Sequence, residues 1–394
     1  MILLGHAFLL LVLPLALAAY WGLLRAPRTR LVFLGLLSYG FYAASDLRFL
    51  PLLLALSFLT FRLAQAGHTG TGVAIHLAVL GIFKAGFAAA ALPLGLSFYA
   101  FKHVGYLLDC RSGVTTPTRD LLAFATHSAF FAQIVAGPID TFTKAGSTLA
   151  ELPARLASDQ ARRGLVFLSL GLAKKVLIAD PLALALRSGL YEAAGGGGLL
   201  WAWSSLVVFG LQLYFDFAGY TDIALGIAQL FGVPLPANFD RPYLATNPRQ
   251  FWDRWHMSLS LWFRVYLFLP LSRALLRRFG RERSEVAQHV ANLATMTLVG
   301  LWHGATGPFL LWGAYHGLLL NLHAWTSRRR WWRAPAAVDH GLLLLAVLVG
   351  WALFLSPDLS FATRLLAQLL GMGGLGGGRA LEAYAEVLIV IAAA

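Results

Sequence analysis

The sequence has few charged residues and almost no cysteine. Charged residues occupy 12% of its 394 positions, whereas about a quarter is usual in soluble domains. A soluble chain of this size could not cover its surface with so few charges, so the composition predicts an integral membrane protein. Cys110 is the single cysteine, which excludes an internal disulfide and a metal site built from several cysteines.

Acidic residues are scarce relative to basic ones. The chain has 31 Lys and Arg against 18 Asp and Glu, a formal net charge of +13. Basic residues collect in the cytoplasmic loops of membrane proteins, and no basic stretch has the pattern of a nucleic-acid site. We therefore expect the lipid bilayer as the surroundings and no nucleic-acid partner.

The N-terminal apolar segment lacks the positive charge with which a signal peptide begins. No Lys or Arg precedes Arg25, and Arg25, Arg28 and Arg30 follow the segment. We expect a retained first helix that starts outside the cytoplasm. The last apolar run, residues 387–394, stops abruptly, which is compatible with a longer native chain.

Long apolar runs are abundant, and the mean hydropathy is +0.69. A spanning helix needs about 20 apolar residues, and shorter runs such as 31–44 and 121–136 predict re-entrant helices. We expect an all-α integral membrane fold, a single polytopic domain over residues 1–394, with about nine to eleven spans. Helices are predicted at 2–24, 31–44, 49–64, 73–92, 94–109, 121–136, 164–188, 199–231, 258–276, 286–302, 309–325, 338–356 and 381–394.

The segment 236–264 differs from the rest of the chain. It contains six charged residues and, from Phe251 to Phe263, five Trp and Phe rings, so it is too charged to face lipid and too aromatic for a free loop. Trp and Tyr favour the membrane interface. We expect this segment to dip into the protein with its charges facing a polar cavity.

His303 is the strongest candidate for a catalytic residue. No Asp, Glu, Lys or Arg occurs from Val286 to Ser327, so His303 is an ionisable group in a membrane-embedded stretch. Gly304, Gly307 and Pro308 follow, so the helix should break beside it. Burial favours the neutral imidazole, which can accept a proton as a general base does. The alternative is a histidine that hydrogen-bonds a neighbouring helix.

His256 is the second candidate, because it lies inside the charged aromatic segment, although an interfacial histidine can simply face water. His316 and His323 lie one heptad apart and are expected to form hydrogen bonds between helices. No context distinguishes the other histidines: His6, His68, His76, His103, His127, His289 and His340.

A polar stripe follows the predicted helix 199–231. Gln212, Asp216 and Gly219 share one face, with Asp222 close by. Carboxylates in the middle of a membrane helix must face the protein interior. The stripe is either a cavity wall or a buried brace to Lys or Arg on another helix, and we favour the brace.

Several motifs are missing. The sequence has no P-loop, no dinucleotide-binding glycine motif, no HExxH and no GxSxG. Because no carboxylate or cysteine lies near His303 in sequence, we expect no metal at the site.

Four stretches nevertheless resemble the membrane-bound O-acyltransferases, in the bacterial branch that contains alginate O-acetyltransferase and the teichoic acid D-alanyl transferase. They lie in a family-like core of about residues 93–320 and match in order and spacing. They are PLGLSFY at 93–99, FFAQIVAGPI at 130–139, YFDFAGYTD at 214–222, and the pair formed by 238–264 and LWHG at 301–304. Lys102 departs from the uncharged polar residue expected there.

The resemblance implies that His303 is the catalytic histidine and His256 the second active-site residue. It also implies a ring of membrane helices around a thinned central funnel in which donor and acceptor meet. We expect these residues to line that cavity: Trp302, Trp255, Arg254, Asp253, Asn238, Tyr243 and Ser258.

Three functions remain open. The first is O-acetylation of an exported polysaccharide or peptidoglycan at the cell inner membrane, with an acyl thioester such as acetyl-CoA or an acyl carrier as donor, no bound cofactor, and an extracytoplasmic acyltransferase as partner. The second is D-alanyl transfer from a carrier protein. The third is a transporter with His303 as a proton relay, which the absence of two related halves disfavours.

Overall fold

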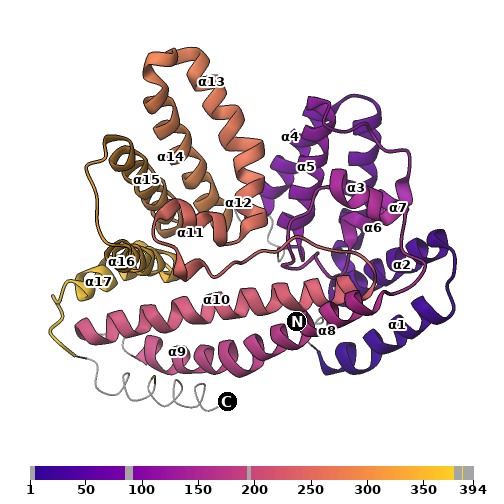
Figure 1. Cartoon of the computed structure of the whole chain (residues 1–394), viewed down its shortest axis with the longest axis horizontal. Coiled ribbons are helices and arrows are strands. Elements are labelled where there is room, and N and C mark those ends of the chain that lie inside the picture. Colours follow the sequence, from indigo (N-terminus) through magenta and orange to yellow (C-terminus); the bar gives the residue numbers. More distant parts are fainter. Residues whose placement is uncertain (1–4, 85–91, 193–196, 377–383, 385–394) are drawn as a thin grey trace. The chain divides into compact units, whose positions relative to one another are not determined.

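The computed structural model describes residues 5–84, 92–192, 197–376 and 384, and every regular element within these ranges is a helix (Figure 1). The all-α prediction is therefore confirmed. The helix expected at 381–394 lies outside the described residues except for Tyr384, as does the end of the helix expected at 73–92.

The chain forms two compact units. The first comprises residues 1–171 and 220–237, and the second residues 172–219 and 238–394. The long helix α10, Gly198–Leu230, contributes to both. The expectation of a single membrane domain stays a prediction.

Helices long and apolar enough to cross a membrane occur throughout the described chain. Length and composition alone identify four such segments, so the expected nine to eleven spans stay a prediction. The four segments are Pro27–Gln65, Gly198–Leu230, Met257–Phe279 and Ala336–Leu355. Shorter apolar helices lie at Phe8–Gly22 and Thr69–Lys84.

The first unit consists of short and medium helices around an aromatic core. Phe131 contacts Phe231 with 5.7 Å between ring centroids, and Tyr20 contacts Phe231 at 5.1 Å. The helices of this unit are α1 (Leu13–Gly22, preceded by the π-helix Phe8–Val12), α2 (Pro27–Asp46), α3 (Leu50–Gln65), α4 (Thr69–Lys84), α5 (Leu96–Ser112), α6 (Leu121–Ala129), α7 (Phe142–Ala150) and α8 (Ser158–Leu172).

The helix predicted at 121–136 is wrong in its second half, because α6 ends at Ala129 and a turn follows. The turn fits closely against the start of α5. Gly95 has a φ of +66°, and a Cβ at this position would collide with the carbonyl oxygen of Ile134. Only glycine meets both conditions, which is why the 93–99 and 130–139 stretches depend on each other.

Lys102 holds the same turn from within the unit. Its side chain is buried, and Nζ donates to the carbonyl oxygen of His127 and to Oε1 of Gln133, both at 2.8 Å. Gln133 in turn donates Nε2–H to the carbonyl oxygen of Pro138. An uncharged residue would not make the same strong charge-assisted bonds, so Lys102 is a structural residue of this turn.

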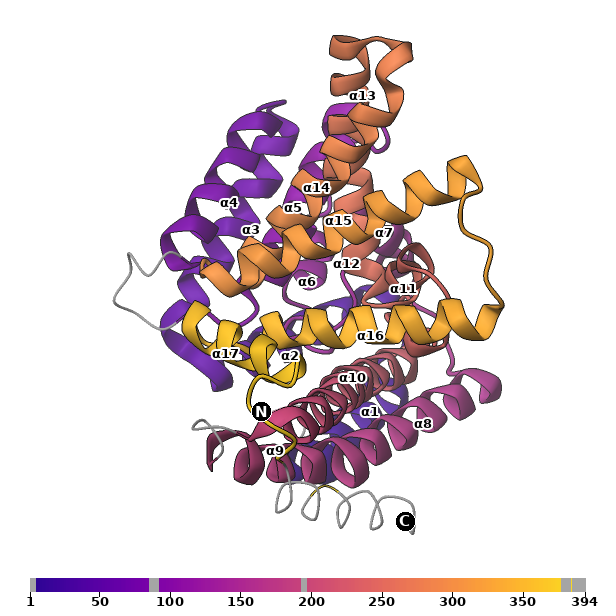
Figure 2. The same ribbon diagram turned by 90° about the vertical axis from the view of Figure 1, so that its left-hand side faces the viewer.

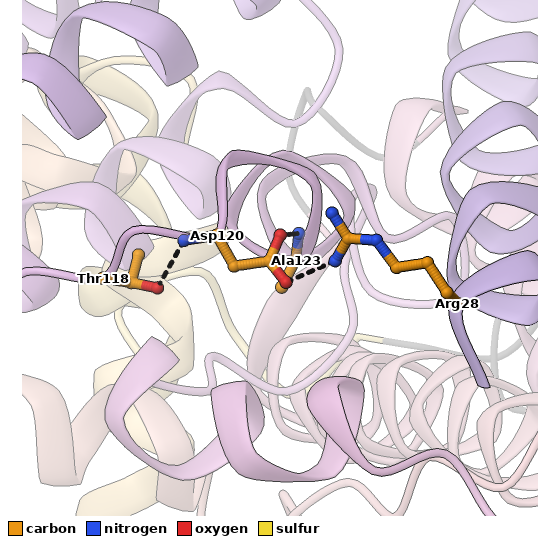
Figure 3. Close-up of polar contacts among 4 residues, drawn as sticks. All are labelled: Arg28, Thr118, Asp120 and Ala123. Atoms are coloured by element: carbon orange, nitrogen blue, oxygen red, sulfur yellow. Dashed lines mark hydrogen bonds and ion pairs between the residues drawn. The ribbon is translucent and has the colours of Figure 1, made fainter.

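Helix α6 begins with a capping residue that also forms an ion pair (Figure 3). Asp120 accepts a hydrogen bond from the backbone N–H of Ala123 at 3.0 Å and pairs with Arg28 of α2 at 2.5 Å. The backbone N–H of Asp120 donates to Thr118 Oγ1. Burial opposes ionisation of Asp120, but these partners outweigh it and lower the pKa of its carboxyl.

The second unit contains both candidate histidines. The predicted helices 164–188 and 258–276 are each interrupted by a π-helical turn, at Ala173–Ala179 and Arg264–Phe268. The helices α11 (Pro248–Arg254) and α17 (Leu359–Leu369) were not predicted from the sequence. The unit contains α9 (Asp180–Glu192), α11 (Pro248–Arg254), α12 (Met257–Phe263), α13 (Leu269–Phe279), α14 (Ser284–His303), α15 (Gly307–Arg329), α16 (Ala336–Leu355) and α17 (Leu359–Leu369).

Helices α14 and α15 form a closely packed antiparallel pair (Figures 1 and 2). A Cβ on Gly300 would collide with the carbonyl oxygen of Phe309, and a Cβ on Gly313 with that of Met296. Small residues let two membrane helices approach this closely. The connection between the helices is short, and His303 is the last residue of α14.

Candidate functional site

His256 is held by Asn238. The Oδ1 atom of Asn238 accepts bonds from the backbone N–H of Ser258 at 3.2 Å, from Ser258 Oγ at 2.6 Å and from His256 Nδ1 at 3.2 Å. A backbone N–H can only donate, so the atom facing it is the oxygen and not the amide nitrogen. The same oxygen requires a proton on His256 Nδ1, which leaves Nε2 of the neutral ring as an acceptor.

The backbone at His256 is unusual. Its φ of 42° and ψ of 55° are left-handed, a conformation that is uncommon outside glycine although histidine tolerates it better than most residues. His256 lies between α11 and α12 as the N-cap of α12, and the residue is 3% exposed. Phe217 contacts the ring edge-on at 4.6 Å, and Phe239 stacks on it at 6.5 Å.

His303 is half-buried among aromatic rings. Its imidazole lies 4.6 Å from the ring of Trp302, 5.2 Å from Trp312 and 5.1 Å from Phe354 between centroids. Phe309 stacks at 6.1 Å. The helix ends directly after His303, because Gly304 is extended with φ −173° and ψ 144°. The break expected beside this histidine is therefore present.

Both histidines belong to the second unit, and a continuous set of ring contacts connects them. From His256 it passes through Phe239, Trp255, Trp351 and Trp312 to His303, with centroid distances of 6.5, 5.2, 5.0, 6.4 and 5.2 Å.

The other residues expected to line the cavity lie in different surroundings. Tyr243 donates its hydroxyl to the carbonyl oxygen of Gly210 at 2.7 Å and packs 6.0 Å from Trp255, which is buried. Asp253 is exposed and lies 3.9 Å from Arg249 and 4.0 Å from Arg264 in ion pairs. Trp302 lies beside His303. Ser258 and Asn238 lie beside His256. The carbonyl oxygen of Arg254 accepts a hydrogen bond from the Asp240 N–H.

The residues of the polar stripe on α10 have different surroundings and belong to different units. Asp216 forms an ion pair with Lys175 of the π-helical turn at 2.6 Å, and Lys175 also pairs with Asp180 at 2.6 Å. Because 42% of the Asp216 side chain is exposed, the brace is partly exposed and not buried as expected. Gln212 belongs to the same unit and is half-buried, whereas Asp222 belongs to the first unit.

His316 does not form the expected bond between helices at its Nε2 atom, which has no hydrogen-bond partner among the described residues. Its buried ring packs instead against Trp312 at 5.1 Å and Trp252 at 5.2 Å. His323 Nδ1 lies 3.5 Å from Ser327 Oγ of its own helix.

A recess of about 570 Å³ belongs to the first unit and to neither histidine. Its lining includes Thr69, Cys110 and Arg111. Within the described ranges, no group of three His, Cys, Asp or Glu side chains is placed to hold a metal ion. A cavity that joins His256 and His303 stays a prediction.

The sequence analysis missed the aromatic residues that surround both histidines. Phe217, Trp312, Trp351 and Phe354 lie on three different helices, and each looks like an ordinary membrane-helix residue in its own stretch. Trp351 and Phe354 are three positions apart on α16, a spacing that puts both on one face. This spacing in the sequence could have indicated that Trp351 and Phe354 lie on the same face of α16.

The all-helical fold and the apolar helices of the described residues define an integral membrane protein. The model of the membrane-bound O-acyltransferase family matches residues 114–331. A probable alginate O-acetylase AlgI of Azotobacter vinelandii is 33% identical over 417 residues, covering 94% of this chain and 78% of the relative.

Two further relatives are named for other acyl transfer reactions. A peptidoglycan O-acetyltransferase of Helicobacter pylori is 30% identical, covering 72% of this chain and 58% of the relative. A teichoic acid D-alanyltransferase of Streptococcus thermophilus is 32% identical, covering 60% of this chain and 58% of the relative. The chain belongs to the membrane-bound O-acyltransferase family and is an acyltransferase.

Proposed function

We propose that this protein transfers an acetyl group from a cytoplasmic thioester donor across the membrane toward hydroxyls of an exported polysaccharide or of peptidoglycan. The observation that carries the proposal is that the second unit places His256 and His303, two ionisable side chains, at the two ends of one continuous aromatic cluster. The names of the Azotobacter vinelandii and Helicobacter pylori relatives support acetyl as the group and a polysaccharide or peptidoglycan as the acceptor.

His303 is proposed as the general base. A hydroxyl attacks the thioester carbonyl, the new C–O bond forms, and the hydroxyl proton passes to the imidazole. The C–S bond then breaks, and the departing thiolate takes the proton from His303. A positioned base of this kind contributes about 10²- to 10⁴-fold in rate. A thioester is reactive enough that the step requires no metal.

His256 is proposed as a second polar group that contacts a reacting oxygen. Asn238 holds the proton on Nδ1, so Nε2 is an acceptor and can orient a hydroxyl toward His303. The conformation of His256 is fixed by its backbone and by Phe217 and Phe239, which favours a preorganised arrangement.

Several finer features belong to the same proposal. The donor is acetyl-CoA or an acyl carrier on the cytoplasmic side, the chain is a multi-pass protein of the cell inner membrane, and an extracytoplasmic acyltransferase completes the transfer. D-alanyl transfer is the second candidate, supported by the 32% identity to the teichoic acid D-alanyltransferase over 60% of this chain.

The decisive variant is His303→Ala. Transfer should be lost, by at least about 10²-fold, while the amount of folded membrane protein stays normal. His323→Ala is the matched control, since it also removes a histidine from this helix pair but lies 20 positions farther along the chain. Wild-type transfer by His303→Ala would overturn the proposal and favour the transporter alternative.

A labelled donor separates two forms of the mechanism. If His303 is a base, single-turnover incubation with donor alone leaves no label on the protein. An acyl-histidine intermediate would leave label that disappears in His303→Ala.

Mass spectrometry of envelope glycans identifies the acyl group and acceptor. Cells that lack the gene should lose acetyl esters from one polymer. Loss of D-alanyl esters instead would replace acetylation by the second candidate.

A further inference from the structure

An arginine-rich surface lies at the end of the α13–α14–α15 bundle away from His303. Helix α13 ends at Phe279 and α14 begins at Ser284, so the residues between them form the tip of this hairpin (Figure 1). Helix α15 returns antiparallel to α14 and ends at Arg329. The exposed arginines of this surface, which we call the arginine end, are Arg277, Arg278, Arg281, Arg283, Arg328, Arg329, Arg330 and Arg333.

Ion pairs and hydrogen bonds hold the helix ends of this surface together. Glu285 of α14 pairs with Arg328 at 3.3 Å and with Arg329 at 3.7 Å. One turn deeper, Asn321 of α15 donates to the carbonyl oxygen of His289 at 2.9 Å. The arginine end is therefore one fixed surface and not two unrelated loops.

Acidic residues balance only a small part of this charge. Glu282 and Glu285 are the acidic residues within 277–285 and 328–333, and Glu285 is already engaged with two arginines. So many exposed cations close together favour an anionic partner.

Two large aromatic rings are exposed within the same surface. Trp331 is 69% exposed and Trp332 is 54% exposed. Tryptophan collects at the level of the lipid headgroups, where its ring meets both apolar and polar surroundings. The apolar span Met257–Phe279, of which only 11% is buried, leads directly into Arg281–Arg283.

We propose that the arginine end binds the headgroups of anionic phospholipids at the cytoplasmic face of the membrane. The exposed tryptophans and the continuity with an apolar span favour lipid over a soluble acidic partner, which would require neither. The attractions of several basic residues to a charged membrane surface add together, so the arginine end should fix the position of the bundle.

This binding would set the depth of His303. Helix α14 has 20 residues, which corresponds to about 30 Å at 1.5 Å per residue. Because the arginine end and His303 lie at opposite ends of this helix, headgroup binding at one end holds the other at a constant depth.

The experiment compares the full chain in detergent with added lipids. Phosphatidylglycerol should raise the Tm of the wild type by several degrees and phosphatidylcholine should not. The variant R277Q/R278Q/R281Q/R283Q should lose at least half of the shift. R162Q/R163Q, two exposed arginines on α8 that pair with Asp159, should keep it.

Folding of each variant is checked by its gel-filtration profile and helical circular dichroism. A second measurement uses vesicles with brominated phosphatidylglycerol, whose quenching of tryptophan fluorescence should fall in W331F/W332F. Equal Tm shifts in the wild type and the fourfold variant would overturn the proposal. So would an equal stabilisation by coenzyme A without lipid, which would assign the surface to a phosphorylated donor. Neither result depends on acetyl transfer.

Discussion

At the scale of single residues, the backbone of His256 restricts what can replace it. Asparagine tolerates the left-handed conformation, whereas a β-branched residue does so poorly. His256→Asn should therefore yield normal amounts of folded protein with transfer reduced by about 10²-fold. His256→Val should lose folded protein. Yield is measured by fluorescence-detected gel filtration and transfer by acetyl ester content, and equal yields of the two variants would contradict a fixed left-handed turn.

Asp216 provides a second prediction at this scale. Its pair with Lys175 is partly exposed, so Asp216→Asn should cost about 1 kcal/mol, near the upper range for exposed pairs. The protein should unfold at a lower Tm and retain transfer. The charge swap K175D/D216K should recover part of the loss. Complete loss of transfer at normal yield would instead make Asp216 part of the reaction centre.

At the scale of elements, the start of α6 should respond to pH. The pKa of Asp120 is lowered in the folded protein, so its contribution to stability is complete above the unfolded value of about 4 and is lost as pH falls through the folded value. Asp120→Asn keeps a capping side chain but loses the partly exposed ion pair with Arg28, so it should lower the Tm at pH 7 by the equivalent of at most about 1 kcal/mol. The difference from the wild type should shrink as pH falls below about 4, toward the lowered folded value. A difference in Tm that stays constant below pH 4 would contradict a contribution from the ionised Asp120 carboxyl.

The α14–α15 pair should be sensitive to a single methyl group. Gly313→Ala would press a Cβ against the backbone of Met296 and Thr297, which cannot move aside as a side chain could. We expect a loss of about 1–3 kcal/mol in stability, as for other overpacked sites. Gly341→Ala is the matched control on α16, because a Cβ there meets nothing within 4 Å. Differential scanning fluorimetry should show a lower Tm only for the first variant.

At the scale of the whole molecule, the apolar helices predict how the protein behaves on extraction. Alkaline carbonate, which strips peripheral proteins, should leave the chain in the membrane pellet, because helices such as Ala336–Leu355 are too apolar to remain in water. Mild detergent should release it. Release by carbonate alone would contradict the membrane assignment.

Composition and hydrophobic runs predicted the helical class and most helices, because these depend on local sequence. They could not predict the end of α6 at Ala129, which is set by the fit of the following turn against Gly95. The two histidines were found because each is a polar residue without a local explanation. The rings that connect them, such as Trp351, come from separate helices, and their proximity exists only in the folded chain.

Asn238 closes the loop that precedes His256. Its carbonyl oxygen accepts the Met257 N–H at 2.8 Å, its side chain binds Ser258, and the Asp240 N–H donates to the carbonyl oxygen of Arg254 at 3.1 Å. The two ends of this loop are thereby fixed to each other independently of the residues between them. The exposed positions Leu244 and Arg249 within this closed loop can then vary, so chimeras that exchange these two residues between relatives should fold.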